Sequence, residues 1–327
     1  MQMWIDMCTA LAVAAAARLG IADVLATSSP QESATLARAV GADATALTRL
    51  LRTLVSLGLL VQPHPQTYAL TSLGAVLRSD HPDSMRDLLI AVTDTPHVQA
   101  WGKLHESVSS GQPSVPALFG MPIFAYYAAH PDERASFSRA MGNLSALAAQ
   151  GTVHHYDFSH ARHIVDVGGA HGDLLLRILH ANPHVRGTVF DLPHVADAAR
   201  QAITVQGYDG RCEALGGDFF QAVPRGGDVY VLKLILHDWP DTEVVRILHN
   251  CRAAMPPDGT LLVIEMVLPD DNHLSPAHLS DLNMLVMTGG LERTAREYGA
   301  LLAQAGFRLT RLIPTGSLYD VLEAVAG

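Results

Sequence analysis

The chain has 327 residues, which is enough for two domains with a large buried core. Hydrophobic residues make up 49% of it and charged residues only 17%, a composition that excludes intrinsic disorder over most of the chain. The net charge of −10 has the wrong sign for electrostatic binding to nucleic acids or anionic membranes, so neither is an expected partner.

The amino-terminal segment is rich in alanine and leucine. Its most apolar run, residues 10–17, is too short to span a bilayer and lacks the basic start of a secretory signal. The helix expected over residues 11–24 is apolar on too many sides to be surrounded by solvent. We therefore expect it to be buried against a partner subunit.

Two short helices and a β-hairpin are expected next. Ser29, Pro30 and Glu32 have the spacing of a helix start, and Asp43 can cap a second helix. Residues 59–71 predict the hairpin, because two apolar runs flank a proline-rich turn. This order of elements is typical of a winged-helix domain.

Winged-helix domains most often bind DNA. Here the second helix offers only Arg49 and Arg52 for phosphate contacts, which is few for a DNA-binding helix. The favoured role is therefore packing or dimerisation, and a winged-helix regulator is the alternative.

From residue 163 onward, short apolar runs alternate with helical patterns. Strands are expected at residues 164–167, 188–191, 229–234, 261–267 and 318–325. Thr294 and Glu297 form a capping box that opens a late helix. This alternation predicts an α/β fold with a doubly wound parallel sheet and helices on both faces.

We place a helical domain at residues 1–100 and the α/β domain at residues 101–327.

A glycine-rich loop, Gly168 to Gly172, joins the first of these strands to a helix. Small residues let a ligand approach the backbone, and the helix start supplies unpaired N–H groups. The dinucleotide motif G-x-G-x-x-G would need a glycine in place of Asp173, which disfavours NAD. Asp191 ends the next strand and can accept hydrogen bonds from both ribose hydroxyls, so the pair suits a nucleoside without phosphates. A plain glycine turn is the alternative.

His237 follows the strand at residues 229–234, at the edge where open α/β sheets bind ligands. With an unperturbed pKa of about 6.5 it would be mostly neutral at pH 7 and able to accept a proton from a hydroxyl. Glu265, inside an apolar strand, and Glu292, before the capped helix, could orient the imidazole. The alternatives are a structural histidine, a solvent-exposed strand end for Glu265 and a helix-dipole contact for Glu292.

Neither a disulfide framework nor a metal site is expected. The three cysteines form no C-x-x-C pair, which fits a reducing, cytoplasmic setting. No known metal-ligand spacing matches the neighbouring histidines His154, His155, His160 and His163.

Five motifs together resemble the plant-type family of S-adenosylmethionine-dependent small-molecule O-methyltransferases, which includes caffeate and flavonoid enzymes and bacterial antibiotic-tailoring enzymes. The motifs are Asp166 to Gly172, Asp191 to Pro193, Gly217 to Phe220, Leu232 to Trp239 and Gly289 to Thr294. The resemblance covers nearly the whole chain. It implies a seven-stranded Rossmann-like sheet ending in an antiparallel strand, and an amino-terminal winged-helix-like domain that forms a homodimer. One departure is Ala170 in place of a glycine, which is tolerable unless its φ must be positive. Another is the loop near Met287, which is one residue shorter than in plant members.

The resemblance also implies roles for individual residues. It places the cofactor S-adenosylmethionine against Ser145, Gly168, Asp191, Leu192, Asp218, Phe219 and Lys233. It makes His237 the base, beside Glu265 and Glu292. It places the acceptor against Met141, Asp238, Met284 and Met287.

We therefore predict transfer of a methyl group to a phenolic hydroxyl of an aromatic secondary metabolite, with S-adenosylhomocysteine as the product. The many alanines and arginines suggest GC-rich coding, hence a bacterial source. The alternatives are a nitrogen or carboxyl acceptor, a diverged relative without methyl transfer and, more remotely, a nicotinamide oxidoreductase.

Overall fold

The computed structural model describes residues 1–82, 84–271 and 273–327. They divide into two compact units, of which the first comprises Met1–Gly102 and Leu118–Asn143, and the second Lys103–Ala117 and Leu144–Gly327. The division predicted at residue 100 differs from this one chiefly in residues 118–143, which group with the first unit.

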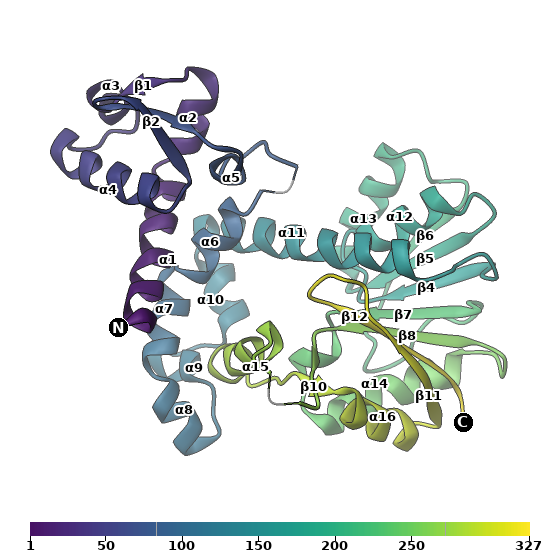
Figure 1. The fold of residues 1–327 in the computed structure, drawn as a ribbon. Coiled ribbons are helices and arrows are strands. Elements are labelled where there is room, and N and C mark those ends of the chain that lie inside the picture. Colours follow the sequence, from purple (N-terminus) through teal and green to yellow (C-terminus); the bar gives the residue numbers. More distant parts are fainter. Residues whose placement is uncertain (83, 272) are drawn as a thin grey trace. The chain divides into compact units, whose positions relative to one another are not determined.

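The first unit is mostly helical and carries a small antiparallel sheet (Figure 1). Its elements are α1 (Gln2–Arg18), α2 (Ile21–Thr27), β1 (Gln31–Glu32), α3 (Ser33–Ala39), α4 (Ala44–Ser56), β2 (Leu60–His64), β3 (Thr67–Leu70), α5 (Ser72–Ala75), α6 (Arg86–Val92), α7 (Thr95–Gly102) and α10 (Ile123–Ala129). No single helix among the described residues is long and apolar enough to cross a membrane, and only α1 and α2 taken together, with a bend of 51° between them, pass that test.

Helices α1 and α2 pack within their own unit. Ala16, Ile21 and Leu25 belong to its core and are at most 2% exposed. They are covered by other parts of the same chain, since α1 contacts α4 and α6, and α2 contacts β3. Among residues 11–24, the buried ones are covered by their own chain and need no partner subunit, and burial of the others against a partner stays a prediction.

The helix start predicted at Ser29 and Pro30 is also wrong. Residues 31 and 32 form β1, which pairs antiparallel with Tyr68 and Thr67 of β3, so the chain is extended there and the helix begins at Ser33. The second helix and the hairpin are confirmed. The side chain of Asp43 caps α4, and β2 pairs antiparallel with β3.

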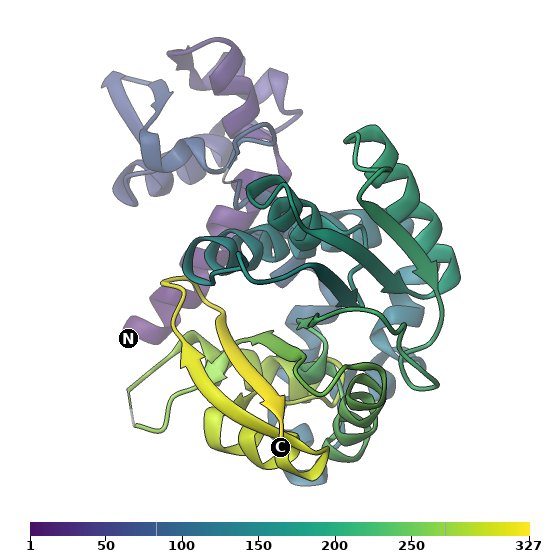
Figure 2. The same ribbon diagram turned by 90° about the vertical axis from the view of Figure 1, so that its right-hand side faces the viewer.

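The second unit is built on a seven-stranded sheet. In spatial order its strands are β11 (Phe307–Ile313), β12 (Asp320–Ala326), β8 (Thr260–Glu265), β7 (Val229–Lys233), β4 (His163–Val167), β5 (Arg186–Asp191) and β6 (Cys212–Gly216). The run from β6 to β8 is parallel, whereas β12 is antiparallel to both of its neighbours. Figure 2 shows the β11–β12 hairpin at one edge of the sheet. The predicted doubly wound α/β fold with an antiparallel last strand is confirmed.

Helices cover both faces of this sheet. The helices of the second unit include α8 (Leu104–Ser110), α12 (Asp173–Ala181), α13 (Pro193–Val205), α14 (Asp241–Ala254), α15 (Pro276–Met287) and α16 (Ala295–Gln304); α9 (Ser114–Phe119) and α11 (Pro131–His155) extend across the division between the units. One core contains residues of α12 and α13, and the other residues of α14 and α16. Because the sheet is covered on both sides, its central strands are nearly continuous apolar runs, in which the buried carboxylates Asp166 and Glu265 stand out.

Candidate active site

The loops that follow the parallel strands meet at the carboxyl edge of the sheet, where open α/β sheets bind ligands. Gly168, after β4, has a φ of +71°, and a Cβ added there would come within 2.4 Å of the Ile235 side chain and 3.7 Å of the Phe219 ring. Only a glycine fits this crowded backbone without displacing its neighbours. The structure thus brings together Gly168 and Phe219, two residues that the sequence assigned to one ligand.

Asp191, at the end of β5, holds the glycine-rich loop. Its Oδ2 accepts a hydrogen bond from the backbone N–H of Ala170 at 2.9 Å, and its Oδ1 one from Leu192 at 2.7 Å. Ala170 has a φ of +49°, which is the condition under which we expected alanine to be unfavourable. The loop therefore keeps the conformation of a glycine while carrying a methyl group.

Lys233, at the end of β7, reaches a residue far away in the sequence. Its Nζ donates a hydrogen bond to Ser145 Oγ at 2.6 Å, although the two residues are 88 positions apart. Burial lowers the pKa of Lys233, and the negative charges of Asp166 and Asp173 oppose this shift. Two predicted cofactor residues, Lys233 and Ser145, are thus in direct contact.

The turn after β6 fixes an aromatic ring. Asp218 Oδ1 accepts a hydrogen bond from the backbone N–H of Phe220 at 2.9 Å. The Phe219 ring packs edge-on against Phe220, with ring centres 4.8 Å apart, and against Trp239 at 6.3 Å. This packing fixes the orientation of the ring that the resemblance assigned to the cofactor.

Asp166 is a residue of the site that sequence reasoning missed. It is 1% exposed, and neither carboxylate oxygen has a hydrogen-bond partner among the described residues. Burial raises the pKa of Asp166 to about 6, although the charge of Lys233 acts against this. The available signal was a charged residue inside the apolar strand at residues 164–167, the same kind of signal that pointed to Glu265.

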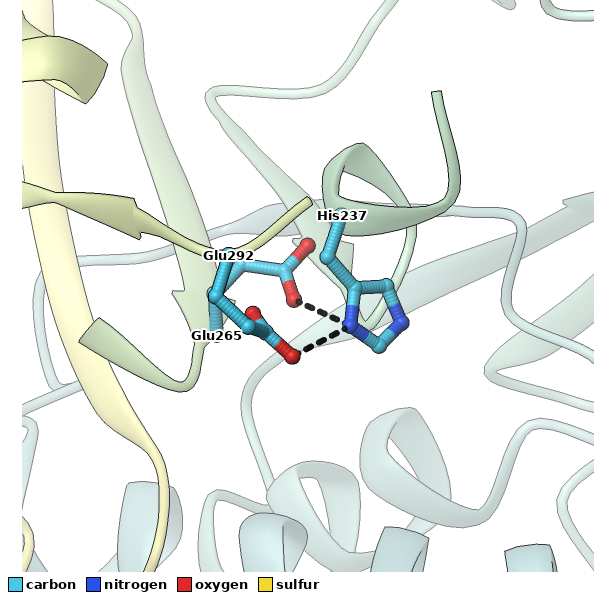
Figure 3. A group of neighbouring side chains, drawn as sticks. All are labelled: His237, Glu265 and Glu292. Carbon is cyan, nitrogen blue, oxygen red and sulfur yellow. Dashed lines mark hydrogen bonds and ion pairs between the residues drawn. The ribbon is translucent and has the colours of Figure 1, made fainter. Parts of the chain in front are cut away.

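His237 lies on a short 3₁₀ turn, η1 (Leu236–Asp238), just after β7. Its Nδ1 lies 3.1 Å from Glu292 Oε1 and 3.8 Å from Glu265 Oε2, and its Nε2 points away from both carboxylates (Figure 3). Glu265 is fully buried and Glu292 is 2% exposed. The alternative that Glu265 is a solvent-exposed strand end is therefore excluded.

Glu265 also shapes the turn that carries His237. Its Oε1 accepts hydrogen bonds from the backbone N–H groups of Ile235 and Leu236, at 3.0 and 2.8 Å. The preceding residue, Leu234, has a φ of +57°, a conformation that costs about 1 to 3 kcal/mol in a residue with a side chain. The two hydrogen bonds to Glu265 help to hold this strained turn in place.

Arg293 also stabilises the turn that carries His237, a role that the sequence analysis did not predict. It is 1% exposed and donates hydrogen bonds to the carbonyl oxygens of Leu236, at 3.1 Å, and Trp239, at 2.8 Å. Its Nη2 lies 2.8 Å from Asp241 Oδ1. Nothing in its sequence neighbourhood marks this role, because the carbonyl groups lie more than 50 positions away.

Helix α15 presents Ser280, Met284 and Met287 on one face, since they are four and three positions apart. Ser280 Oγ donates a hydrogen bond to Glu292 Oε1 at 2.7 Å. Met284 is partly exposed, whereas Met287 is 4% exposed and packs mainly in the interior. Met141 belongs to the first unit and is 37% exposed, so its predicted contact with the acceptor stays a prediction.

The buried carboxylates make His237 more basic than expected. Burial alone lowers the pKa of His237, but the charge of Glu265, the hydrogen bond to Glu292 and the charge of Asp238 raise it overall to about 10. Burial raises the pKa of Glu265 to about 7, against the opposing charge of His237. This differs from the expectation of a mostly neutral imidazole at pH 7, because the neighbouring carboxylates favour its protonated form.

Comparison with known proteins identifies the family. An O-methyltransferase domain model matches residues 101–308, and an O-methyltransferase dimerisation domain model matches residues 6–80. The chain belongs to the O-methyltransferase family.

Three matches illustrate the relationship. Phenazine O-methyltransferase PhzM of Lysobacter antibioticus is 42% identical over 309 residues, which cover 94% of this chain and 90% of that protein. The crystal structure of LaPhzM has a TM-score of 0.91 at 40% identity, covering 100% of this chain and 98% of that one. The O-methyltransferase NcsB1 from neocarzinostatin biosynthesis, solved with S-adenosylmethionine and 2-hydroxy-5-methyl naphthoic acid, has a TM-score of 0.81 at 36% identity, with coverages of 98% and 96%. This chain is thus an S-adenosylmethionine-dependent O-methyltransferase.

The sheet edge of this methyltransferase fits that cofactor. The methionine part of S-adenosylmethionine carries a cationic amino group, and Asp166 is a buried carboxylate without a partner among the described residues. Gly168 lies so close to Ile235 and Phe219 that a side chain at this position would clash with Ile235. When bound, S-adenosylmethionine supplies a methyl group on a positively charged sulfur.

Proposed function

We propose that this methyltransferase methylates a hydroxyl group of a small aromatic acceptor and that His237 removes the hydroxyl proton. The observation that carries the proposal is an imidazole whose Nδ1 faces two buried carboxylates while its Nε2 points away from them. A phenol has a pKa of about 10. The pKa of His237 is also about 10, so the proton can pass between the phenol oxygen and Nε2 with little change in free energy.

Methyl transfer requires a complex in which His237 and the phenol together hold one proton fewer than the imidazolium and the neutral phenol do. With that proton gone, His237 takes the hydroxyl proton onto Nε2 and the acceptor becomes a phenolate. The phenolate oxygen then forms a bond to the methyl carbon as the carbon–sulfur bond breaks. Glu265 and Glu292 stabilise the imidazolium until Nε2 releases its proton to solvent.

For the cofactor we propose a site along the loops after β4, β5, β6 and β7. We assign to it Ser145, Gly168, Asp191, Leu192, Asp218, Phe219 and Lys233. Support comes from the contact between Lys233 and Ser145 and from the approach of Gly168 to the Phe219 ring. We add Asp166, because a buried carboxylate without a partner is costly and the amino group of the cofactor would neutralise it.

For the acceptor we propose contacts with Asp238, Met284, Met287 and Met141. Asp238 Oδ1 lies 3.9 Å from His237 Nε2, on the side of the ring that faces away from the glutamates. Met284 lies one helical turn from Ser280, which touches Glu292. Of these, Asp238 and Met284 would hold an aromatic ring with its hydroxyl against Nε2.

We further propose a homodimer formed through the first unit. Residues 6–80 match a dimerisation domain, and α1 exposes the large apolar side chains of Met3, Trp4 and Met7. Such a surface is unfavourable in water unless a partner covers it. Sedimentation equilibrium at micromolar concentration is expected to give twice the mass of the chain, and a stable monomer would contradict the proposal.

A methyl-transfer screen tests the function. The purified protein is incubated with S-adenosylmethionine carrying a labelled methyl group and a panel of phenols, hydroxynaphthoates, hydroxyquinones and anthracycline-like compounds. Hydroxynaphthoates are included because the similar NcsB1 is solved with one. We expect label on oxygen in at least one aromatic product. Transfer only to matched amines or carboxylates would overturn the choice of acceptor.

A further inference from the structure

The three side chains around the base also have the geometry of a metal site. His237 Nδ1 and one carboxylate oxygen each from Glu265 and Glu292 all lie within 4.8 Å of one another. The distances from Nδ1 to the two carboxylates are 3.1 and 3.8 Å. Ligand atoms at usual zinc distances in a tetrahedral site are about 3.4 Å apart, which lies between these two values. Small movements of the side chains would therefore suffice to surround a zinc ion.

Glu265 has an oxygen free to act as a ligand. Its Oε2, 3.8 Å from Nδ1, is buried and has no hydrogen-bond partner among the described residues, while the amides of Ile235 and Leu236 hold its Oε1. In Glu292 the oxygen 3.1 Å from Nδ1 is Oε1, which also accepts a hydrogen bond from Ser280. Contacts of this kind orient the ligands of a metal ion and fix its geometry.

The charges also favour a divalent cation. Two buried carboxylates lie on the Nδ1 side of the imidazole, and the Asp238 carboxylate lies 3.9 Å from Nε2. Negative charge is costly to bury, and a divalent cation would offset it. One nitrogen and two oxygen ligands suit zinc or cobalt better than magnesium or calcium, which prefer oxygen ligands alone.

We propose that His237, Glu265 and Glu292 form an inhibitory site for zinc. Binding forms a bond between zinc and His237 Nδ1, and the proton of Nδ1 leaves to solvent. The imidazole then keeps its only remaining proton on Nε2 and cannot take one from an acceptor hydroxyl. Zinc on Nδ1 therefore prevents Nε2 from accepting the hydroxyl proton. The metal does not need to touch the acceptor, because the acceptor faces the other nitrogen of the ring.

Cobalt is the probe for binding, because four-coordinate Co²⁺ absorbs visible light far more strongly than the six-coordinate ion bound by surface histidines. Co²⁺ is titrated into cofactor-free protein that has been treated with a chelator. We expect one equivalent of intensely absorbing Co²⁺, displaced by one equivalent of Zn²⁺. This signal is expected to be lost in Glu265→Gln and Glu292→Gln and kept in His273→Ala, which removes an exposed histidine 3.1 Å from Asp271. An unchanged signal in both glutamine variants overturns the proposal.

A second measurement does not depend on a variant that folds. X-ray absorption of the wild-type protein with one equivalent of Zn²⁺ is expected to show one imidazole and oxygen ligands at about 2.0 to 2.2 Å. A first shell of several imidazoles would place the zinc among surface histidines and overturn the proposal.

The inhibitory effect rests on the proposed function and is measured separately. With an acceptor from the screen, Zn²⁺ is expected to abolish turnover at one equivalent, and EDTA to restore it. Cobalt binding without loss of turnover would refute the inhibition alone, whereas the absence of any acceptor would leave the binding result standing and refute the proposed function.

Discussion

The two halves of the carboxyl edge hold their functional groups by different means. After β5 and β6, where we place the nucleoside, Asp191 and Asp218 bind backbone N–H groups in short turns. After β7 and β8, where we place proton transfer, three side chains from separate elements form a buried cluster. The pKa values of His237 and Glu265 are raised there. Local motifs can specify the first arrangement, whereas the chemistry of the second depends on tertiary contacts.

The largest expected effect comes from removing the base. His237→Ala should lower turnover by about 10² to 10⁴-fold, the usual contribution of a positioned base. Affinity for S-adenosylhomocysteine should change less than about twofold, because His237 lies outside the loops after β5 and β6 where we place the nucleoside. Initial rates and calorimetry measure the two quantities.

His273→Ala is the matched control, since it removes an exposed histidine that also pairs with an aspartate. It should leave both quantities as they are in the wild type. If His237→Ala retains the wild-type rate at pH 7, His237 is not the base.

At the loops after β5 and β6, where we place the nucleoside, a substitution is expected to change cofactor affinity. Asp191→Ala removes a carboxylate proposed to bind ribose and frees the loop at Ala170. Hydrogen bonds to charged groups contribute about 1.5 to 3 kcal/mol, so the Kd for S-adenosylhomocysteine should rise by roughly 10- to 100-fold. Calorimetry checks this against Asp258→Ala, an exposed carboxylate whose loss should change nothing. Equal affinity in the two variants would remove Asp191 from the cofactor site.

The pH dependence of kcat/KM tests whether the buried carboxylates raise the pKa of His237. A base with a raised pKa is protonated at neutral pH, so kcat/KM should rise as pH increases, by up to about tenfold per unit, until His237 loses its proton. Glu292→Gln removes a charge and a hydrogen bond that raise the pKa of His237. The rising part of the profile should therefore move to lower pH.

A Glu297→Gln variant is the control, because Glu297 caps α16 and does not contact His237. Its profile should match that of the wild type. A shift of the Glu292→Gln profile to higher pH would show that Glu292 does not raise the pKa of His237.

The sequence predicts the features that depend on local patterns and misses those that depend on long-range contacts. The glycine-rich loop, Asp191 and the capping box at Thr294 are local patterns, and the structure has them where they were expected. The buried position of Glu265 was one of two possibilities, but its effect on His237 was not foreseen, because the pKa depends on contacts between residues 28 and 55 positions away. Arg293 and Ser280 left no local signal, since each acts through long-range contacts.

Local patterns also failed where a tertiary contact overrode them. Ser29 and Pro30 have a helix-start pattern, yet β1 pairs with β3 and delays the helix to Ser33. At Asp43 no strand competes, and the side chain caps α4 as expected. Identical reasoning therefore succeeds or fails according to what the chain packs against.

The smallest expected effect concerns Ala170, where local sequence and local backbone disagree. Its φ of +49° is unfavourable for an L-residue by about 1 to 2 kcal/mol, whereas glycine adopts it freely but loses about 0.5 to 1 kcal/mol more entropy on folding. Ala170→Gly should therefore raise the free energy of unfolding by somewhat under 1 kcal/mol, measured by denaturant unfolding. Ala303→Gly, in the ordinary helix α16, should instead lower it by up to about 1 kcal/mol. If both variants lose stability alike, the loop at Ala170 does not store the backbone strain that its φ indicates.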